Sequence, residues 1–414
     1  MIITTPPFIR SSPFRRAFTL FLLAFLCGSS APDLFAAPGD IVSLDFEKRM
    51  TPSDVDAFIE KLFVGYEAPK AKYPVDVYWL KFESLYPDGE KAVATAQVFM
   101  PSFEPGDVAV RPLYAFGPGS TGVIDACRPS REHLSRLHWG YYRAHTLAHA
   151  GQGAIGVMPD YLGFGDPDRD QYYMVAKAEA SAMLDSIRAV KTIVVRGGFG
   201  GVSDTRNYVA GFSQGGHAAF AAADCLKSYA PELRLDGVIG YGPSADLIAL
   251  FKEFPDVAPM VLYTFRNLYG KEAVDPDLAL AKVFAPSLDY DITRQCVGGM
   301  QSYYPIDPKR LFNAEFSKAL LGGTLQKAYP GIFKALTDNS TGLAGHGVPV
   351  LICQGTDDIV VHGPTQAAFV KALEEAGSTV EYNIYKGVRH DTRQASFEDV
   401  QAWMNRPADT GSDR

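Results

Sequence analysis

Short apolar runs with the composition of β-strands recur along the chain and alternate with helical patterns. Eight such runs stand at residues 75–85, 91–100, 111–117, 153–160, 206–213, 235–242, 348–355 and 379–387. Between them, helical patterns cover residues 133–148, 175–194, 214–229 and 365–376. Because parallel strands need a crossover connection, usually a helix, this alternation predicts the α/β class, with a mostly parallel eight-stranded sheet covered by helices on both faces.

One long interval interrupts the alternation. Residues 246–345 show helical and loop patterns only, and about 100 residues is far longer than an ordinary connection. We interpret this segment as a mainly helical cap, inserted into a core made of residues 37–245 and 346–405, with residues 406–414 as a flexible tail. The aromatic residues of the insertion suit a cap above an apolar pocket, and they equally suit a small core of the insertion itself.

The N-terminal segment has the layout of an export signal. Arginines up to Arg16 precede an apolar run from Ala17 to Leu26, which is too short to span a bilayer comfortably, and small residues follow. We therefore expect residues 1–36 to be a signal peptide and the mature chain to be exported to the periplasm or the outside. An uncleaved membrane anchor is the alternative.

Charge and cysteine content narrow the functional classes. The net charge of −8 becomes about −10 without residues 1–36, which disfavours nucleic acid as a partner. The sequence contains no Cys-x-x-Cys pair and no His-Glu-x-x-His, so we expect neither a metal nor another cofactor. Apart from Cys27, four cysteines remain, a number compatible with disulfides in an oxidising compartment. No feature indicates an obligate protein partner.

The candidate nucleophile is Ser213. The string Gly211-Phe212-Ser213-Gln214-Gly215 joins the end of the fifth apolar run to an alanine-rich helical pattern. A strained strand-to-helix turn that presents a serine needs small residues two positions before and after it, because a side chain there would strike the neighbouring backbone. The string alone arises by chance with a probability of about 0.2 in a chain of this length, so its position is the stronger signal.

A histidine and a carboxylate stand where they can activate this serine. A hydroxyl is a poor nucleophile until a base takes its proton, and His390 directly follows the last apolar run. The imidazole in turn needs a carboxylate, and Asp358 is the fourth residue of a Gly-x-x-Asp-x-x-Val loop after the seventh run. Its neighbour Asp357 is the alternative acid. If Asp358 is the acid, Asp357 is a capping or surface residue. The order serine, acid, histidine is that of the α/β-hydrolase fold.

A tetrahedral intermediate on Ser213 would need two backbone N–H donors for its oxyanion. One is expected from Gln214, at the start of the helical pattern. The other is expected from the glycine-rich loop after the third run, at Ser120 or else at Gly119. A glycine-rich turn without a catalytic part is the alternative.

At these residues the sequence resembles the secretory lipase family, which includes the fungal lipase A type enzymes. The matching pieces are GPGSTGVIDACRPS (117–130), MPDYLGFGD (158–166), VAGFSQGGHAA (209–219) and LICQGTDDIVV (351–361), followed by His390. The likeness runs through nearly all of the mature chain and thins in the insertion. It implies a cap after the sixth strand, hydrolysis of esters of medium to long acyl chains, and a triad of Ser213, Asp358 and His390.

The resemblance carries further implications. It implies a disulfide between Cys127 and Cys296, with the remaining cysteines, Cys225 and Cys353, as buried thiols. It also implies that two residues of the PDYLGFGD segment shape the pocket wall, although a structural turn is equally consistent; these are Asp160 and Tyr161. The family commonly has His-Gly-Thr at the oxyanion loop, where this chain has Pro-Gly-Ser.

The main functional hypothesis is therefore a secreted serine hydrolase of carboxylic esters, a lipase or esterase, that forms an acyl-enzyme on Ser213. Its substrate would be a small-molecule or lipid ester, and a transient contact with a lipid interface is compatible with this activity. A serine peptidase of the aminopeptidase or prolyl type is the alternative enzyme, although the insertion shows no obvious acidic cluster to hold a substrate amino terminus. A non-catalytic binding protein on the same fold is the alternative outside enzymes.

Overall fold

The computed structural model describes residues 36–104, 106–132, 139–196 and 201–406. In these residues one sheet has nine strands in the order β1-β2-β3-β5-β4-β6-β7-β8-β9. The strands are β1 (Ile41–Met50), β2 (Val75–Leu85), β3 (Lys91–Pro101), β4 (Ala109–Gly117), β5 (Ile155–Pro159), β6 (Val202–Phe212), β7 (Gly237–Tyr241), β8 (Val350–Gly355) and β9 (Val380–Tyr385). Strands β4 to β9 pair in parallel, whereas β1, β2 and β3 join the sheet through antiparallel pairs.

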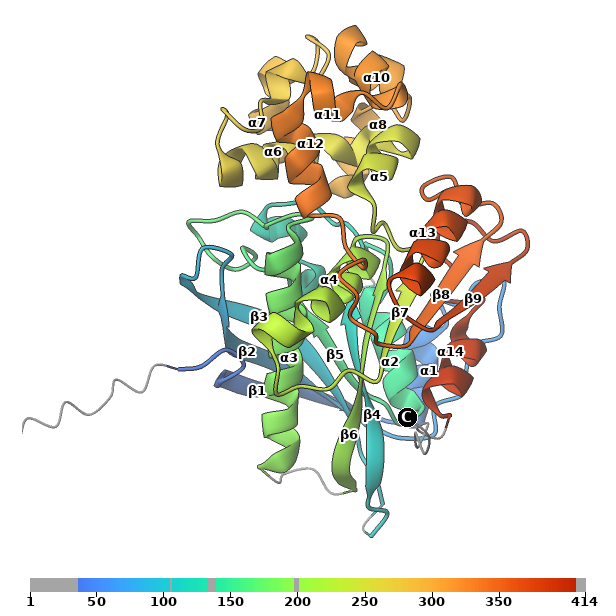
Figure 1. Cartoon of the computed structure of the whole chain (residues 1–414). Helices are drawn as coiled ribbons and strands as arrows, with labels where there is room; N and C mark the ends of the chain where they lie inside the picture. The colour runs from blue at the N-terminus through green and yellow to red at the C-terminus, as the bar shows by residue number, and fades with distance from the viewer. Residues whose placement is uncertain (1–35, 105, 133–138, 197–200, 407–414) are drawn as a thin grey trace, which may run out of the picture. The chain divides into compact units, whose positions relative to one another are not determined.

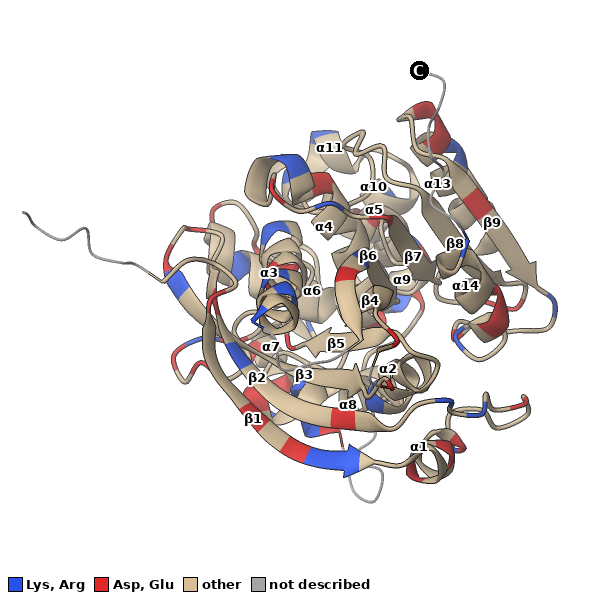
Figure 2. Cartoon of the chain, turned by 90° about the horizontal axis from the view of Figure 1, so that it is seen from below, with Lys and Arg blue, Asp and Glu red and all other residues tan. Residues whose placement is uncertain are grey.

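The expected α/β class is confirmed, but the expected number of eight strands is wrong by one, because β1 is missing from the prediction. This strand, IVSLDFEKRM, lies at the edge of the sheet and carries four charged residues between Asp45 and Arg49. An edge strand pairs on one side only and tolerates charge, which also discourages pairing with other chains. Figure 2 shows the red and blue bands along β1. Inner strands such as β7 and β8 are buried at every residue and therefore read as apolar runs.

Helices occupy both faces of the sheet and the long insertion. They are α1 (Pro52–Ile59), α2 (Tyr142–Gly151), α3 (Ala176–Val195), α4 (Gln214–Tyr229), α5 (Leu247–Glu253), α6 (Ala258–Tyr269), α7 (Leu288–Ile292), α8 (Val297–Tyr303), α9 (Pro308–Leu311), α10 (Ala314–Leu321), α11 (Leu325–Ala328), α12 (Pro330–Asp338), α13 (Gly363–Glu375) and α14 (Phe397–Met404). Short 3-10 turns add to these, of which η1 (Asp125–Cys127) and η3 (Pro255–Val257) flank the site described below.

The helix expected over residues 133–148 is shorter than expected at its start. Helix α2 begins at Tyr142, and residues 133–138 lie outside the described part of the chain. Tyr141 has a left-handed backbone, with φ of 54°, which stops the helix from extending backwards. The Glu132 carboxylate instead accepts hydrogen bonds from the backbone N–H groups of Trp139 and Gly140, at 3.0 and 3.1 Å.

Alternate residues of the strands feed two apolar cores, one on each face. Leu113 and Ala115 of β4 belong to the core under α3, α4 and α13, which continues into the insertion. Tyr114 and Phe116 belong to the core under α1, α2 and α14. Figure 1 shows the sheet between these two helical layers. It also shows the helices α5 to α12 of the insertion, which lie beyond the ends of the strands. The layered arrangement leaves the carboxyl ends of the parallel strands to build a site.

Most residues of the expected signal peptide and of the expected tail lie outside the described part of the chain. The signal peptide expected over residues 1–36 lies outside the described residues apart from Ala36. Of the tail expected over residues 406–414, only Arg406 is described, and it pairs with Glu381 at 2.6 Å. Among the described helices, none has the length and apolar character needed to cross a membrane.

Candidate active site

Ser213 occupies a strained turn between β6 and α4. Its φ of 55° and ψ of −114° are unusual for a residue with a side chain. Such strain persists only where the surroundings hold it, and it gathers at functional sites. Here the Ser213 N–H donates to the Tyr241 carbonyl at 3.1 Å, and the Ser213 carbonyl accepts from the Ser244 N–H at 3.2 Å. The strand therefore delivers Ser213 at the carboxyl edge of the sheet in a fixed backbone geometry.

The glycines around Ser213 are required by space. A Cβ on Gly211 would lie 1.9 Å from the Gly215 carbonyl oxygen, and a Cβ on Gly215 would lie 1.7 Å from the Gly117 carbonyl oxygen. Both clashes are with backbone, which cannot move aside as a flexible side chain would. The start of α4 thus packs directly against the ends of β6 and β4, and this close packing brings the loop after β4 beside Ser213.

His390 and Asp358 meet in the loops after β9 and β8. The Nδ1 atom of His390 lies 2.9 Å from Oδ2 of Asp358. The His390 ring packs on Phe212, with ring centroids 4.9 Å apart. In the described part of the chain, the other ring nitrogen, Nε2, is buried without a hydrogen-bond partner. The contact through Nδ1 fixes the ring and leaves Nε2 free to handle a proton.

The carboxylate that contacts His390 belongs to Asp358 and not to Asp357. Asp358 Oδ1 accepts from the N–H groups of Val360 and Val361, at 2.8 and 3.0 Å. Burial on its own raises the pKa of Asp358, but the His390 contact and these backbone donors bring it below the ordinary value. Asp357 is exposed and accepts from the Thr356 hydroxyl at 2.8 Å. The buried, ionised acid is thus the one predicted from the loop pattern.

Ser213 and His390 line the same cavity of about 230 Å³, together with Ser120. Its core side is completed by Trp139, Tyr142, Tyr173, Met174, Phe212 and Ser244, and its remaining walls come from the insertion and the acid loop through Leu250, Phe254, Val257, Val297, Gln301 and Val360. We call it the catalytic cavity. Only Phe254 of the insertion's aromatic residues lines it, whereas rings such as Phe251, Phe265 and Phe316 are buried in the insertion's own packing.

The expected oxyanion donors lie at this cavity or next to it. Gln214 opens α4, so its backbone N–H has no acceptor within the helix. Ser120 lines the cavity, and its hydroxyl shares a hydrogen bond of 2.7 Å with the Tyr173 hydroxyl. The backbone of Gly119 instead interacts with the Tyr142 hydroxyl, and a Cβ at this position would lie 2.6 Å from that oxygen. The geometry favours Ser120 over Gly119.

Asp160 and Tyr161 do not line the catalytic cavity. The Asp160 carboxylate is buried and accepts from the Ser130 N–H at 2.8 Å and from the Thr95 hydroxyl at 2.6 Å. The Tyr161 hydroxyl donates to the Pro118 carbonyl at 2.5 Å. Both residues therefore bond to the backbone of other segments. Asp160 anchors the segment at Ser130, and Tyr161 holds the loop that leads to Ser120.

Cys127 and Cys296 form the disulfide that the resemblance implies. It joins η1, which follows the oxyanion loop, to the residue that precedes α8 in the insertion. Of the other two cysteines in the described residues, Cys353 is buried as expected, but Cys225 is only half-buried, which corrects that expectation.

The structure contains a buried pair near Ser213, Glu179 with His217, that the sequence analysis did not predict. Glu179 of α3 contacts His217 Nδ1 at 2.5 Å and accepts from the Gln214 side-chain amide at 2.7 Å. Burial alone lowers the pKa of His217, but the Glu179 charge and hydrogen bond raise it above the ordinary value. A signal existed in the sequence: Glu179 stands one turn before Met183 on the apolar side of the helical pattern, where a carboxylate needs a partner.

Arg393 is the other missed residue, and it has no comparable signal because it lies in a loop. Its guanidinium is fully buried, bonds Asp391 at 2.6 and 2.8 Å, and lies over the rings of Tyr142 and Phe212. The Phe212 ring also packs on His390, so Arg393 supports the position of His390 through Phe212. Arg393 is therefore a positioning residue for the loop that carries His390.

Comparisons with known proteins identify the family and the fold. A profile of the secretory lipase family matches residues 144–402. No curated protein sequence matches the chain. The fold is similar to the rice cell wall degrading esterase LipA of Xanthomonas oryzae, with a TM-score of 0.69 and 19% identity over 89% of this chain and 96% of that one.

Two further solved structures have the same fold. A hydrolase of Legionella pneumophila gives a TM-score of 0.69 and 18% identity over 90% of this chain and 100% of that one. Candida antarctica lipase A in its closed state gives a TM-score of 0.58 and 18% identity over 89% and 81% of the two chains. The fold is thus the α/β-hydrolase fold of lipases and esterases. The family match covers more than half of the chain, and the protein belongs to the secretory lipase family.

Proposed function

We propose that this lipase-family hydrolase cleaves carboxylic esters through an acyl-enzyme on Ser213, with His390 as base and Asp358 as the orienting acid. The observation that carries the proposal is the strained Ser213 turn at one cavity with His390, whose far nitrogen is fixed by a buried carboxylate. Acyl transfer needs groups of these kinds: a nucleophile, a base at the same cavity, and an acid that holds the base.

The reaction follows from these positions. Ser213 Oγ attacks the ester carbonyl carbon while His390 Nε2 takes the hydroxyl proton. The tetrahedral intermediate collapses, the bond to the alcohol oxygen breaks, and His390 returns the proton to the departing alcohol. Water then attacks the acyl-enzyme and gives a proton to His390, the bond between the acyl carbon and Ser213 Oγ breaks, and His390 returns the proton to Oγ as the acid product leaves. Ionised Asp358 stabilises the imidazolium in both halves.

The oxyanion of each intermediate would be held by the backbone N–H groups of Gln214 and Ser120. Gln214 stands at the N-terminus of α4, where the helix dipole also favours negative charge. Its side chain is held by Glu179, and the Ser120 hydroxyl is held by Tyr173. These contacts keep both donors in place before substrate arrives.

Export and contact with lipid complete the proposal. The signal layout of residues 1–36 and the family's secretory description support export to the periplasm or the outside. The insertion also exposes large apolar side chains that suit a transient contact with a lipid surface; among them are Tyr269, Leu278, Val283, Tyr290, Tyr303, Ile306 and Leu321.

The test is turnover of p-nitrophenyl butyrate by the mature protein and by Ser213→Ala. The variant should lose a factor on the order of 10⁴ to 10⁶ in kcat while keeping the circular dichroism of the parent. Turnover that persists in Ser213→Ala would rule out the acyl-enzyme. A parent that cleaves an aminoacyl anilide faster than the ester would replace the esterase with a peptidase.

A further inference from the structure

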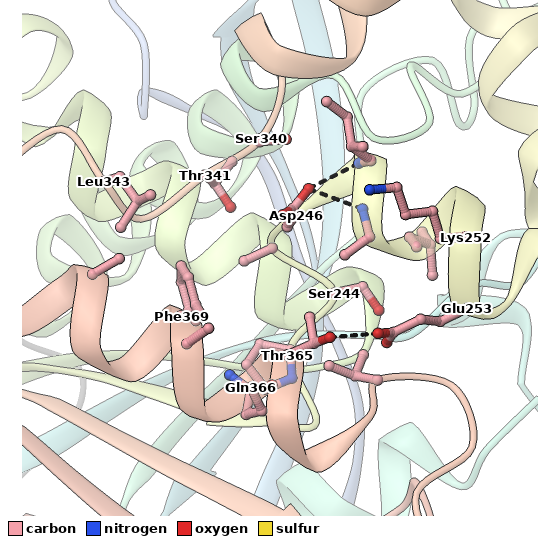
Figure 3. Close-up of a pocket in the computed structure, with 18 of the residues that line it drawn as sticks. Ser244, Asp246, Lys252, Glu253, Ser340, Thr341, Leu343, Thr365, Gln366 and Phe369 are labelled. Carbon is pink, nitrogen blue, oxygen red and sulfur yellow. Dashed lines mark hydrogen bonds between the residues drawn. The ribbon is translucent and has the colours of Figure 1, made fainter. Parts of the chain in front are cut away.

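A second cavity lies beside the catalytic cavity. It has a volume of about 560 Å³, within the roughly 300–1,000 Å³ typical of small-molecule pockets. Ser244, Leu250 and Val360 line both cavities, so the two adjoin along a common wall. Figure 3 shows the second cavity between the start of the insertion, the segment at Ser340 to Leu343, and the first turns of α13.

Hydrogen bonds hold the walls of this cavity in place. Asp246 caps α5 by accepting from the N–H groups of Ile248 and Ala249, at 2.9 and 3.0 Å. At the other end of the helix, Glu253 accepts from the His362 N–H at 2.9 Å and from the Thr365 hydroxyl. Figure 3 marks the contacts of Asp246 and the contact of Glu253 with Thr365. The insertion is thereby tied to α13, and the cavity is preformed.

Two side chains in the wall carry unused hydrogen-bonding groups. Gln366 is 1% exposed, and within the described residues neither its amide oxygen nor its amide nitrogen has a partner. Ser244 is 2% exposed, and its hydroxyl is likewise unpartnered there. A buried polar group without a partner is unfavourable, so both side chains favour a polar occupant. The other walls are mainly apolar, with Leu343, Phe333 and Phe369.

The position of the cavity assigns it to one side of the ester. In the sheet, β4 with the oxyanion loop lies on one side of β6, and β7 and β8 lie on the other. Ser244 follows β7 and Val360 follows β8, so the second cavity lies away from the oxyanion loop and beside the loop of Asp358. When the ester carbonyl oxygen lies at Ser120, the leaving oxygen of the ester lies towards His390, because His390 must protonate it. The departing alcohol therefore faces the second cavity.

We infer that the second cavity is the subsite for the alcohol portion of the ester, and that it selects bulky, mainly apolar alcohols with a further hydroxyl or carbonyl oxygen that bonds Gln366. This inference rests on the proposed ester hydrolysis. Ser244, on the wall between the cavities, offers a second polar contact near the scissile bond. An alcohol too small to reach Gln366, such as ethanol, gains nothing from the subsite.

The test compares three butyrate esters that share the acyl group: ethyl, para-ethylbenzyl and para-(hydroxymethyl)benzyl. The last two have alcohols of nearly equal shape, in which a methyl group replaces a hydroxyl. Ala368→Phe fills the cavity, and Ala367→Phe is its matched control, because the neighbouring residue of α13 is also exposed but does not line the cavity. Gln366→Leu removes the amide while keeping a similar volume.

Ala368→Phe should lower kcat/KM for both benzyl esters about ten-fold and leave ethyl butyrate within about two-fold, whereas Ala367→Phe changes none of them by more. Gln366→Leu should lower kcat/KM about ten-fold for the hydroxymethyl ester alone, mainly through KM, with no loss of thermal stability. Equal effects of Ala368→Phe on all three esters, or of Gln366→Leu on both benzyl esters, would overturn the subsite. Under either result the parent protein still hydrolyses ethyl butyrate, so the proposed function would stand without the subsite.

Discussion

Two buried carboxylates, Asp358 in the core and Asp256 in the insertion, have opposite environments. Asp358 contacts His390 and two backbone N–H groups, and these partners bring its pKa below the ordinary value despite burial. Asp256 is 1% exposed in η3, and burial raises its pKa to about 7, because among the described residues only a contact with the Val257 backbone N–H opposes the effect of burial. Partners, and not burial, decide whether a buried carboxylate stays charged.

A similar difference separates the reacting groups from the polar groups that face the insertion. The core fixes the reacting groups through backbone turns, glycine contacts and paired charges. Where core and insertion meet, by contrast, the polar atoms of Ser244, Thr264 and Gln366 are buried without partners in the described structure. A core built this way suits chemistry that every substrate shares, whereas open polar groups suit selection among substrates.

The largest effect should come from breaking the partnered carboxylate. Asp358→Asn keeps the shape but stabilises the wrong histidine tautomer, and it should lower kcat for p-nitrophenyl butyrate by a factor on the order of 10⁴. Asp357→Asn is the matched control next to it and should stay within about two-fold of the parent. Equal losses in the two variants would mean that the environment of Asp358 does not distinguish it from its neighbour.

The buried Asp256 carboxylate should change how the free energy of unfolding depends on pH. Because the folded-state pKa of Asp256 is about 7 and its ordinary value is 3.8, the folded protein holds this proton more tightly than the unfolded chain does. Its contribution is fully present below about pH 4 and is lost as the pH rises through 7. At pH 8, Asp256→Asn should therefore raise the free energy of unfolding by up to about 4 kcal/mol, and at pH 4 by little.

Urea unfolding of both proteins at pH 4, 6 and 8 measures this difference. Glu315→Gln, at an exposed carboxylate of the insertion, controls for the loss of one negative charge and should not reproduce the pH dependence. A stability difference between Asp256→Asn and the parent that is the same at each pH would mean that Asp256 has a partner in solution.

The sequence allowed the core to be predicted because its local patterns have local causes. Strands buried on both faces read as apolar runs, and the glycines at 211 and 215 are fixed by backbone clashes of under 2 Å. Residue order then places Ser213, Asp358 and His390 after the ends of β6, β8 and β9. The edge strand β1 escaped because a strand paired on one side needs no apolar run.

The walls of the cavities could not be predicted in this way. They depend on how short helices of the insertion pack, and no period in the sequence reports that packing. Val297 and Gln301 reach the catalytic cavity because the Cys127–Cys296 disulfide holds the start of α8 beside the oxyanion loop. Arg393 is similarly beyond prediction, because its buried position depends on rings contributed by Tyr142 and Phe212 from distant segments.

The central claim is that Ser213 is made reactive by His390, and mass mapping of a covalent phosphonate tests it most directly. A p-nitrophenyl phosphonate should add once per chain, on the peptide that contains Ser213, and His390→Ala should slow the labelling by a factor on the order of 10³ or more. An adduct on another residue, or labelling of Ser213 at the parent's rate in His390→Ala, would contradict the account.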